Sequence, residues 1–142
     1  MAAFPPPKLQ EAAEQVASLL RERQETISVA ETAAGGLVSA ALLATPGASR
    51  IYKGGVTLYT LESRLAFAGW TQSNIDNYDG PTPQLVAGLA THVRDALKST
   101  YCVGEPGWRH RRFPTIKYLI PFWPAQLRPL VSHSTVPFLV YF

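Results

Sequence analysis

The sequence has little cysteine, little charge and no long apolar run. Its 142 residues include one cysteine, Cys102, which excludes an intramolecular disulfide framework and favours a reducing compartment. No segment approaches the roughly 18 apolar residues of a membrane-spanning helix, so no membrane partner is expected. The opening residues, Met-Ala-Ala-Phe-Pro-Pro-Pro, lack the basic start and apolar segment of a secretory signal. Together these absences predict a cytoplasmic protein.

Acidic residues are missing from the last part of the chain. Residues 1–105 contain eight Lys or Arg and ten Asp or Glu, whereas residues 106–142 contain five basic residues and no acidic one. The C-terminal segment also holds six prolines, which block helices and central strands. We therefore divide the chain into a Pro-rich lead-in (1–7), an α/β domain (8–105) and an atypical tail (106–142). We hypothesise that the tail derives from a retained intron, an altered reading frame or a mis-predicted gene model.

The first 105 residues carry the apolar periodicity of alternating helices and strands. Apolar side chains at spacings of three and four predict the first helix and its buried face, formed by Leu9, Ala12, Val16, Leu19 and Leu20. Thr82-Pro83 marks the start of a long helix, because a hydroxyl N-cap followed by proline favours helix initiation. Predicted helices span 8–23, 35–43, 61–68 and 82–99, predicted strands span 26–30, 56–59 and 101–103, and residues 74–80 are expected to form a polar loop. This alternation predicts an α/β fold with helices on both faces of the sheet.

Residues 29–37 are the most informative segment of the chain. An apolar strand ends at Glu31 and Thr32, and Gly35 and Gly36 then open an apolar helix. A strand, glycine turn and helix start can place backbone N–H groups and the helix dipole around an anion. A plain tight turn is the alternative, with Glu31 as a partner of the helix dipole and Thr32 as the helix N-cap.

Four motifs occur in order along residues 8–105. They are Ala30-Glu31-Thr32-Ala33-Ala34-Gly35-Gly36, Pro46-Gly47-Ala48-Ser49, Gly54-Gly55-Val56-Thr57-Leu58-Tyr59-Thr60-Leu61-Glu62-Ser63-Arg64, and Gly80-Pro81-Thr82-Pro83. In order and spacing they resemble the CinA C-terminal-domain family, the nicotinamide-mononucleotide deamidases. The resemblance implies a three-layer α/β/α sandwich, here incomplete at the C-terminus because the family's closing pattern does not follow Gly104.

The resemblance also implies an activity and a set of site residues. The activity is hydrolysis of the carboxamide of nicotinamide mononucleotide to the acid, with release of ammonia and with no cofactor or metal. Carried over by position, the catalytic residues are Thr32, Tyr59 and Arg64. The implied substrate-binding residues are Glu31, Ala33, Ala34, Gly35, Gly36, Gly54, Gly55 and Thr82.

Two of the three catalytic positions depart from the family's Ser, Tyr and Lys. Thr32 keeps a hydroxyl that can attack the substrate or orient water. Arg64 stays protonated, so it cannot serve as a base as a buried lysine does, although its planar fork can hold a phosphate or carboxylate. The non-catalytic alternatives place Tyr59 in the core or at its rim and Arg64 on a solvated helix face.

Three functional hypotheses follow: an amidohydrolase of the CinA type, a relative that binds a nucleotide without turnover, and a truncated product without activity. His92 is interpreted as a structural residue at the edge of the core and Cys102 as buried and inert, and His110 and His133 lack the spacing of metal ligands. The basic run 109–112 is weak support for a nucleic-acid partner. The expected partner is a small nucleotide, and the family resemblance is compatible with a homo-oligomer.

Overall fold

The computed structural model describes residues 4–105 and 139–141. The described part forms an α/β fold, as the alternating pattern predicted, and none of its helices is long and apolar enough to cross a membrane. In chain order the elements are α1 (Pro7–Arg23), β1 (Ile27–Glu31), α2 (Leu37–Leu43), the 3-10 helix η1 (Ala48–Arg50), β2 (Tyr52–Thr57), α3 (Leu61–Phe67), α4 (Gln72–Asp76), α5 (Pro83–Leu97), β3 (Tyr101–Gly104) and β4 (Leu139–Tyr141).

The four strands form one sheet in the order β2-β1-β3-β4. β1 pairs in parallel with β2 on one side and with β3 on the other, so that Val29 lies opposite both Gly55 and Val103. β4 pairs antiparallel with β3. All five residues of β1 are buried, which is expected of an inner strand in a sheet covered on both faces.

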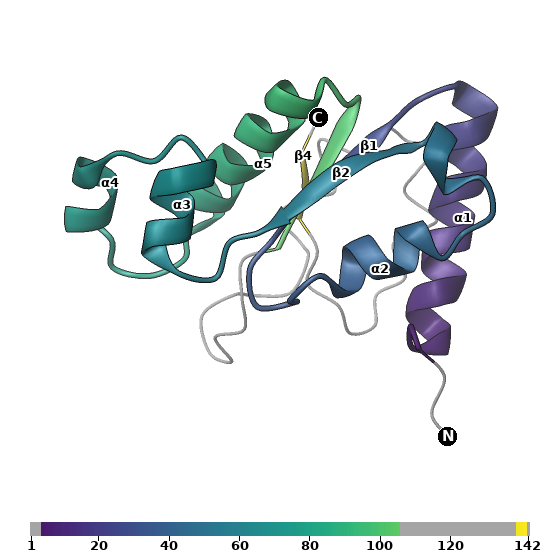
Figure 1. Cartoon of the computed structure of the whole chain (residues 1–142), viewed down its shortest axis with the longest axis horizontal. Helices are drawn as coiled ribbons and strands as arrows, with labels where there is room; N and C mark the ends of the chain where they lie inside the picture. Colours follow the sequence, from purple (N-terminus) through teal and green to yellow (C-terminus); the bar gives the residue numbers. More distant parts are fainter. Residues whose placement is uncertain (1–3, 106–138, 142) are drawn as a thin grey trace.

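Two hydrophobic clusters cover opposite faces of the sheet, because successive side chains of a strand point to opposite sides. Val29 and Val103 face the cluster that α1 and α2 supply, whereas Ala30 and Cys102 face the cluster supplied mainly by α5. The helices flank the sheet in this way in Figure 1, with α3 and α4 together at one end of the molecule. The prediction of helices on both faces is confirmed.

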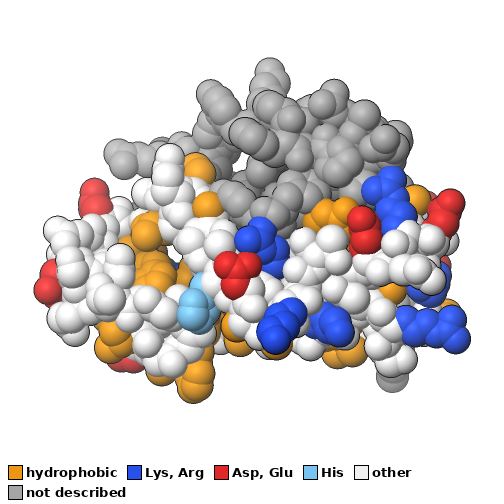
Figure 2. All heavy atoms as spheres, turned by 90° about the horizontal axis from the view of Figure 1, so that it is seen from above, with side chains coloured by type: hydrophobic (Ala, Val, Ile, Leu, Met, Phe, Trp, Pro, Cys, Tyr) orange, Lys and Arg blue, Asp and Glu red, His pale blue; other side chains and the backbone are white. Residues whose placement is uncertain are grey.

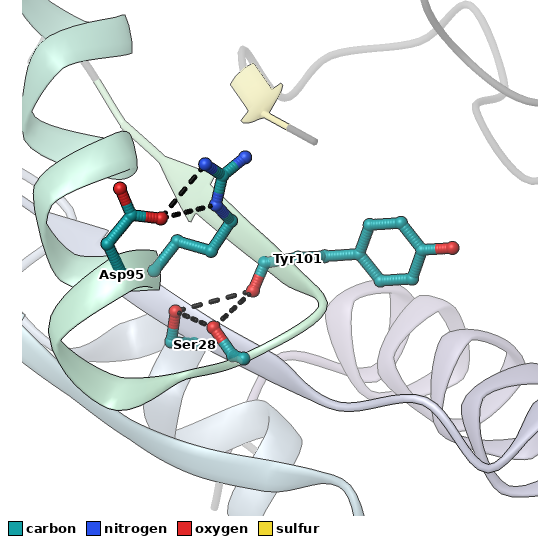
Figure 3. A network of polar contacts seen from close by, with 5 residues as sticks. Ser28, Asp95 and Tyr101 are labelled. Carbon is teal, nitrogen blue, oxygen red and sulfur yellow. Dashed lines mark hydrogen bonds and ion pairs between the residues drawn. The ribbon is translucent and has the colours of Figure 1, made fainter.

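Ser28 is a fully buried hydroxyl in β1 that is satisfied by neighbours from β3 and the turn before it. Its Oγ lies 2.7 Å from Ser99 Oγ, and both hydroxyls approach the carbonyl oxygen of Tyr101, at 3.3 and 2.9 Å (Figure 3). The network ties β1 to the start of β3, well away from the carboxyl ends of the strands.

Three predicted elements need correction. The strand expected at 56–59 is β2, Tyr52–Thr57, and it contains the two glycines that were expected to precede it. Residues 74–80 are not all loop, because α4 forms over Gln72–Asp76 behind a Thr71–Asn74 capping box. The described sheet also contains β4, a short strand next to β3 that the apolar pattern did not predict.

Gly55 of β2 lies too close to β1 for a side chain to fit. A Cβ at this position would lie 2.7 Å from Tyr52 Oη and 2.9 Å from the Val29 carbonyl oxygen. A side chain of any size would therefore push β2 away from β1. Gly55 thus permits a close backbone approach, a role that period-two hydrophobic patterns do not reveal.

Candidate functional site

The carboxyl ends of β1 and β3 lie side by side. The chain passes from β1 to β2 on one side of β1 and later crosses to β3 on its other side. In open parallel sheets such a topological switch point is where ligands usually bind. Thr32 and Glu105 stand here, each directly after its strand. This edge of the sheet is the candidate site.

Thr32 and Glu105 are joined by several hydrogen bonds and are both buried. The Thr32 N–H donates to Glu105 Oε2 at 3.0 Å, and the Ala34 N–H donates to the same oxygen at 2.9 Å. The Thr32 hydroxyl donates to the Glu105 carbonyl oxygen at 2.9 Å and lies 3.2 Å from Oε2. Thr32 is therefore not the N-cap of α2, the role that the alternative interpretation gave it; the N-cap is Gly36.

Glu31 is the anion at the start of α2. Its side chain is fully buried, and its two carboxylate oxygens accept bonds from the N–H groups of Gly36, Val38 and Ser39 and from the Ser39 hydroxyl, at 2.6 to 3.1 Å. The Gly35 N–H is directed to the Thr32 carbonyl oxygen. The backbone N–H groups that were expected to bind a ligand are thus bonded to other groups of the chain. The contacts of Glu31 fit the alternative interpretation, in which its carboxylate pairs with the dipole at the start of the helix.

Glu31 also affects a neighbour on β2. Burial raises the pKa of Tyr52 above its usual 10.0; a hydrogen bond with Ser39 opposes the shift, and the negative charge of Glu31 adds to it.

Arg64 is buried, not on a solvated helix face. It is 7% exposed, and its guanidinium carbon lies 5.2 Å from the centre of the Trp70 ring and 5.4 Å from that of Tyr78. Its Nε donates to the Leu58 carbonyl oxygen at 3.3 Å. Among the described residues no carboxylate pairs with it, and its two terminal amino groups have no hydrogen-bond acceptor. A buried cation with donors left over is uncommon in proteins.

The other predicted residues make separate contacts. Tyr59 follows β2 and is 73% exposed, at the rim. Thr82 is exposed and caps α5, as predicted, by accepting the Leu85 N–H at 3.2 Å. Gly54 and Gly55 are strand residues paired with β1. Ala33 is exposed on the loop beside Thr32.

The surface is hollowed beside Tyr78. An open pocket is lined by Tyr78, Asp79, Gly80 and Pro81. The space-filling view shows hydrophobic side chains on the floor of a hollow at the end of the molecule that carries α3 and α4 (Figure 2). Tyr78 thus lines this pocket and also contacts the guanidinium of Arg64, whose central carbon is 5.4 Å from its ring centre.

Comparison with known proteins decides the family. The model of the CinA C-terminal domain matches residues 9–109. The chain belongs to the CinA C-terminal domain family. A CinA-like protein of Thermosynechococcus vestitus is 34% identical over 92 residues, covering 65% of this chain and 22% of that protein. A CinA-like protein of Flavobacterium psychrophilum is 29% identical over 89 residues, covering 63% and 21%. The chain thus spans about a fifth of the length of these CinA relatives.

Solved structures of CinA-type proteins share the fold. Competence/damage inducible protein CihA from Agrobacterium tumefaciens superposes with a TM-score of 0.67 at 21% identity, over 80% of this chain and 72% of that one. A competence or damage-inducible protein from Enterobacter asburiae gives a TM-score of 0.62 at 22% identity, over 67% and 60%. These likenesses extend the family assignment to the three-dimensional architecture.

Sequence reasoning missed three residues of this CinA domain that shape the site. Glu105 was used only as a domain boundary, although it stands directly after a predicted strand, as Thr32 does. Trp70 and Tyr78 fell in segments without periodicity, so no pattern linked them to Arg64. The signal that could have found Glu105 is the rule that the carboxyl ends of parallel strands meet at one edge.

Proposed function

We propose that this CinA domain binds a pyridine mononucleotide of the nicotinamide mononucleotide type without hydrolysing it. In this proposal Arg64 holds the phosphate, and the pyridine carboxamide lies toward the Thr32 loop. The observation that carries the proposal is the buried guanidinium of Arg64, whose terminal amino groups have no acceptor within the described ranges 4–105 and 139–141.

The chemistry of Arg64 supports binding in preference to catalysis. A guanidinium has no lone pair that accepts a proton, so Arg64 cannot take a proton from the Thr32 hydroxyl. Its planar fork matches the oxygens of a phosphate, and bonds to such an anion are about twice as strong as neutral ones. Trp70 and Tyr78 hold the fork in one orientation through their ring faces.

Amidohydrolysis is the second candidate, and one observation favours it. Glu105 Oε2 lies 3.2 Å from the Thr32 hydroxyl, so a carboxylate stands where a proton acceptor would be needed. Against this, Oε2 already accepts two backbone N–H groups, and the hydroxyl also donates to the Glu105 carbonyl oxygen. Tyr59 is exposed at the rim, and within the described residues no hydrogen bond directs its side chain toward this hydroxyl.

Titration calorimetry with nicotinamide mononucleotide tests the proposal. The native chain is expected to bind, and Arg64→Gln is expected to weaken binding about 10- to 100-fold, since it removes a charge-assisted contact. Arg50→Gln is the matched control, because Arg50 is an exposed arginine outside the site. Equal affinity for the native chain and the Arg64→Gln variant would exclude Arg64 as the phosphate ligand.

A further inference from the structure

Arg64 and Trp70 are connected twice, through the backbone and through their side chains. The Arg64 carbonyl oxygen accepts the Ala68 N–H at 2.9 Å and the Trp70 N–H at 3.4 Å. The guanidinium carbon of Arg64 lies 5.2 Å from the centre of the Trp70 ring. The chain therefore turns back after α3, and a residue beyond the helix covers the guanidinium of a residue within it.

Gly69 makes this turn. Its φ is +68°, in the left-handed region that glycine adopts without strain. A Cβ here would lie 2.8 Å from two ring atoms of His92 on α5, so the neighbouring helix leaves no room for a side chain. Ala68 is buried in the hydrophobic cluster that α5 supplies, and Trp70 packs against the same cluster. The turn is thus fixed against α5, and the position of the indole ring is fixed with it.

The indole ring constrains a guanidinium that has few other partners. The Arg64 Nε–H is bonded to the Leu58 carbonyl oxygen, and within residues 4–105 and 139–141 the two terminal amino groups have no acceptor. An arginine side chain has many rotamers, and immobilising it only when a ligand binds costs affinity. A ring face that holds the cation before the ligand arrives removes part of that cost.

We propose that Trp70 is a positioning residue for the Arg64 site. Its indole face, set by the Gly69 turn, holds the guanidinium ready for the ligand phosphate without itself touching the ligand. This inference rests on the proposed function, because it takes the phosphate to bind Arg64. Trp70 has this role and Tyr78 does not, because Tyr78 lines the open pocket and because indole is the strongest ring partner of a cation.

Calorimetry with nicotinamide mononucleotide on the full chain tests the role of the ring. Trp70→Leu keeps an apolar side chain but removes the ring face, and we expect its dissociation constant to be about 3- to 30-fold larger than that of the native chain. Trp70→Phe restores a ring face, so its dissociation constant is expected to lie within about threefold of the native value. Trp70→Met, with a flexible side chain that fills irregular space, replaces Trp70→Leu if that variant does not fold.

Phe67→Leu is the matched control. Phe67 is an exposed aromatic residue at the end of α3, outside the contacts of Arg64. The same loss of an aromatic ring is expected to leave binding there at the native level.

A double-mutant cycle separates positioning from a general structural role. In the Arg64→Gln background, Trp70→Leu is expected to leave the dissociation constant unchanged, because no guanidinium remains for the ring to hold. An equal loss of affinity in both backgrounds would show that Trp70 acts by a route other than Arg64, and would overturn the proposal.

The remaining outcomes distinguish this inference from the proposed function. Native affinity in Trp70→Leu, or a Trp70→Phe variant that binds as weakly as Trp70→Leu, would overturn the positioning role and leave the proposed function standing. Absence of binding by the native chain would overturn the proposed function and this inference with it.

Discussion

The guanidinium of Arg64 is stacked against Trp70, with its central carbon 5.2 Å from the centre of the indole ring. The ring face and one backbone carbonyl are its attractive partners in the described part of the chain, together with Tyr78 at 5.4 Å. Burying a charge without a counter-charge costs folding free energy. Such a residue is expected to serve binding at the expense of stability.

Arg64→Met tests this trade-off. Methionine fills a similar volume without a charge, so the free energy of unfolding is expected to stay level or rise by about 1 kcal/mol, while nucleotide binding is lost. Denaturant unfolding and calorimetry measure the two effects. The exposed Arg50→Met is expected to change neither, and a loss of more than about 2 kcal/mol in Arg64→Met would show that the cation stabilises the fold.

Glu31→Ala is expected to destabilise the fold by about 2 to 4 kcal/mol. The substitution leaves three backbone N–H groups and the Ser39 hydroxyl without their acceptor at a buried helix start. Denaturant unfolding is the measurement, and Glu22→Ala on the exposed side of α1 is expected to stay within about 0.5 kcal/mol of the native chain. Equal effects of the two substitutions would argue against Glu31 as the organiser of α2.

Gly55→Ala and Gly88→Ala are expected to change stability in opposite directions. A Cβ at Gly55 would lie 2.9 Å from the backbone oxygen of Val29, so we expect a loss of about 1 to 3 kcal/mol. A Cβ at Gly88 meets nothing within 4 Å in α5, so a gain of about 0.5 to 1 kcal/mol is expected from the better helix former. Melting temperatures of the two variants check both signs, and a neutral Gly55→Ala would contradict the close approach of β2 to β1.

Cys102 provides a pH-dependent prediction. Burial raises the pKa of its thiol from 9.0 to about 11, and its fully buried side chain confirms the interpretation of this cysteine as buried. The folded state holds the thiol proton more tightly than the unfolded state, so this contribution to stability is present below pH 9 and is lost as the pH rises toward 11. Cys102→Ala is expected to flatten the fall in unfolding free energy over that range.

Labelling of the thiol gives an independent check. At pH 8 the folded chain is expected to react with a thiol reagent much more slowly than the urea-unfolded chain, since the thiolate is scarce and shielded. Equal labelling rates would show that Cys102 is accessible in the folded protein.

The sequence predicted the elements that local pattern specifies. Thr82-Pro83 marked the start of α5, and the apolar runs of β1 and β3 identified the inner strands. α1 was found as well, although its buried face is centred on Ala13 and Ala17, with Ala12 exposed. Alanine is common on both the buried and the exposed side of a helix, so an alanine-rich pattern can place the buried face one residue away from its true position.

The arrangement of the site could not be predicted in the same way. Thr32 and Glu105 are 73 residues apart, and their contact follows from the order of the strands, which no local pattern contains. The burial of Arg64 depends on Trp70 and Tyr78, two aromatic residues outside any periodic segment. His92 was expected at the edge of the core, but it is exposed, with its ring packed beside Gly69.

Binding and ammonia release measured on the same sample of the full chain test the central claim most directly. With nicotinamide mononucleotide we predict saturable binding, seen as a rise in melting temperature, and ammonia at the level of the protein-free control. Ammonia release above that level that disappears in Thr32→Ala, or the absence of any binding, would contradict the claim that this CinA domain binds the nucleotide without hydrolysing it.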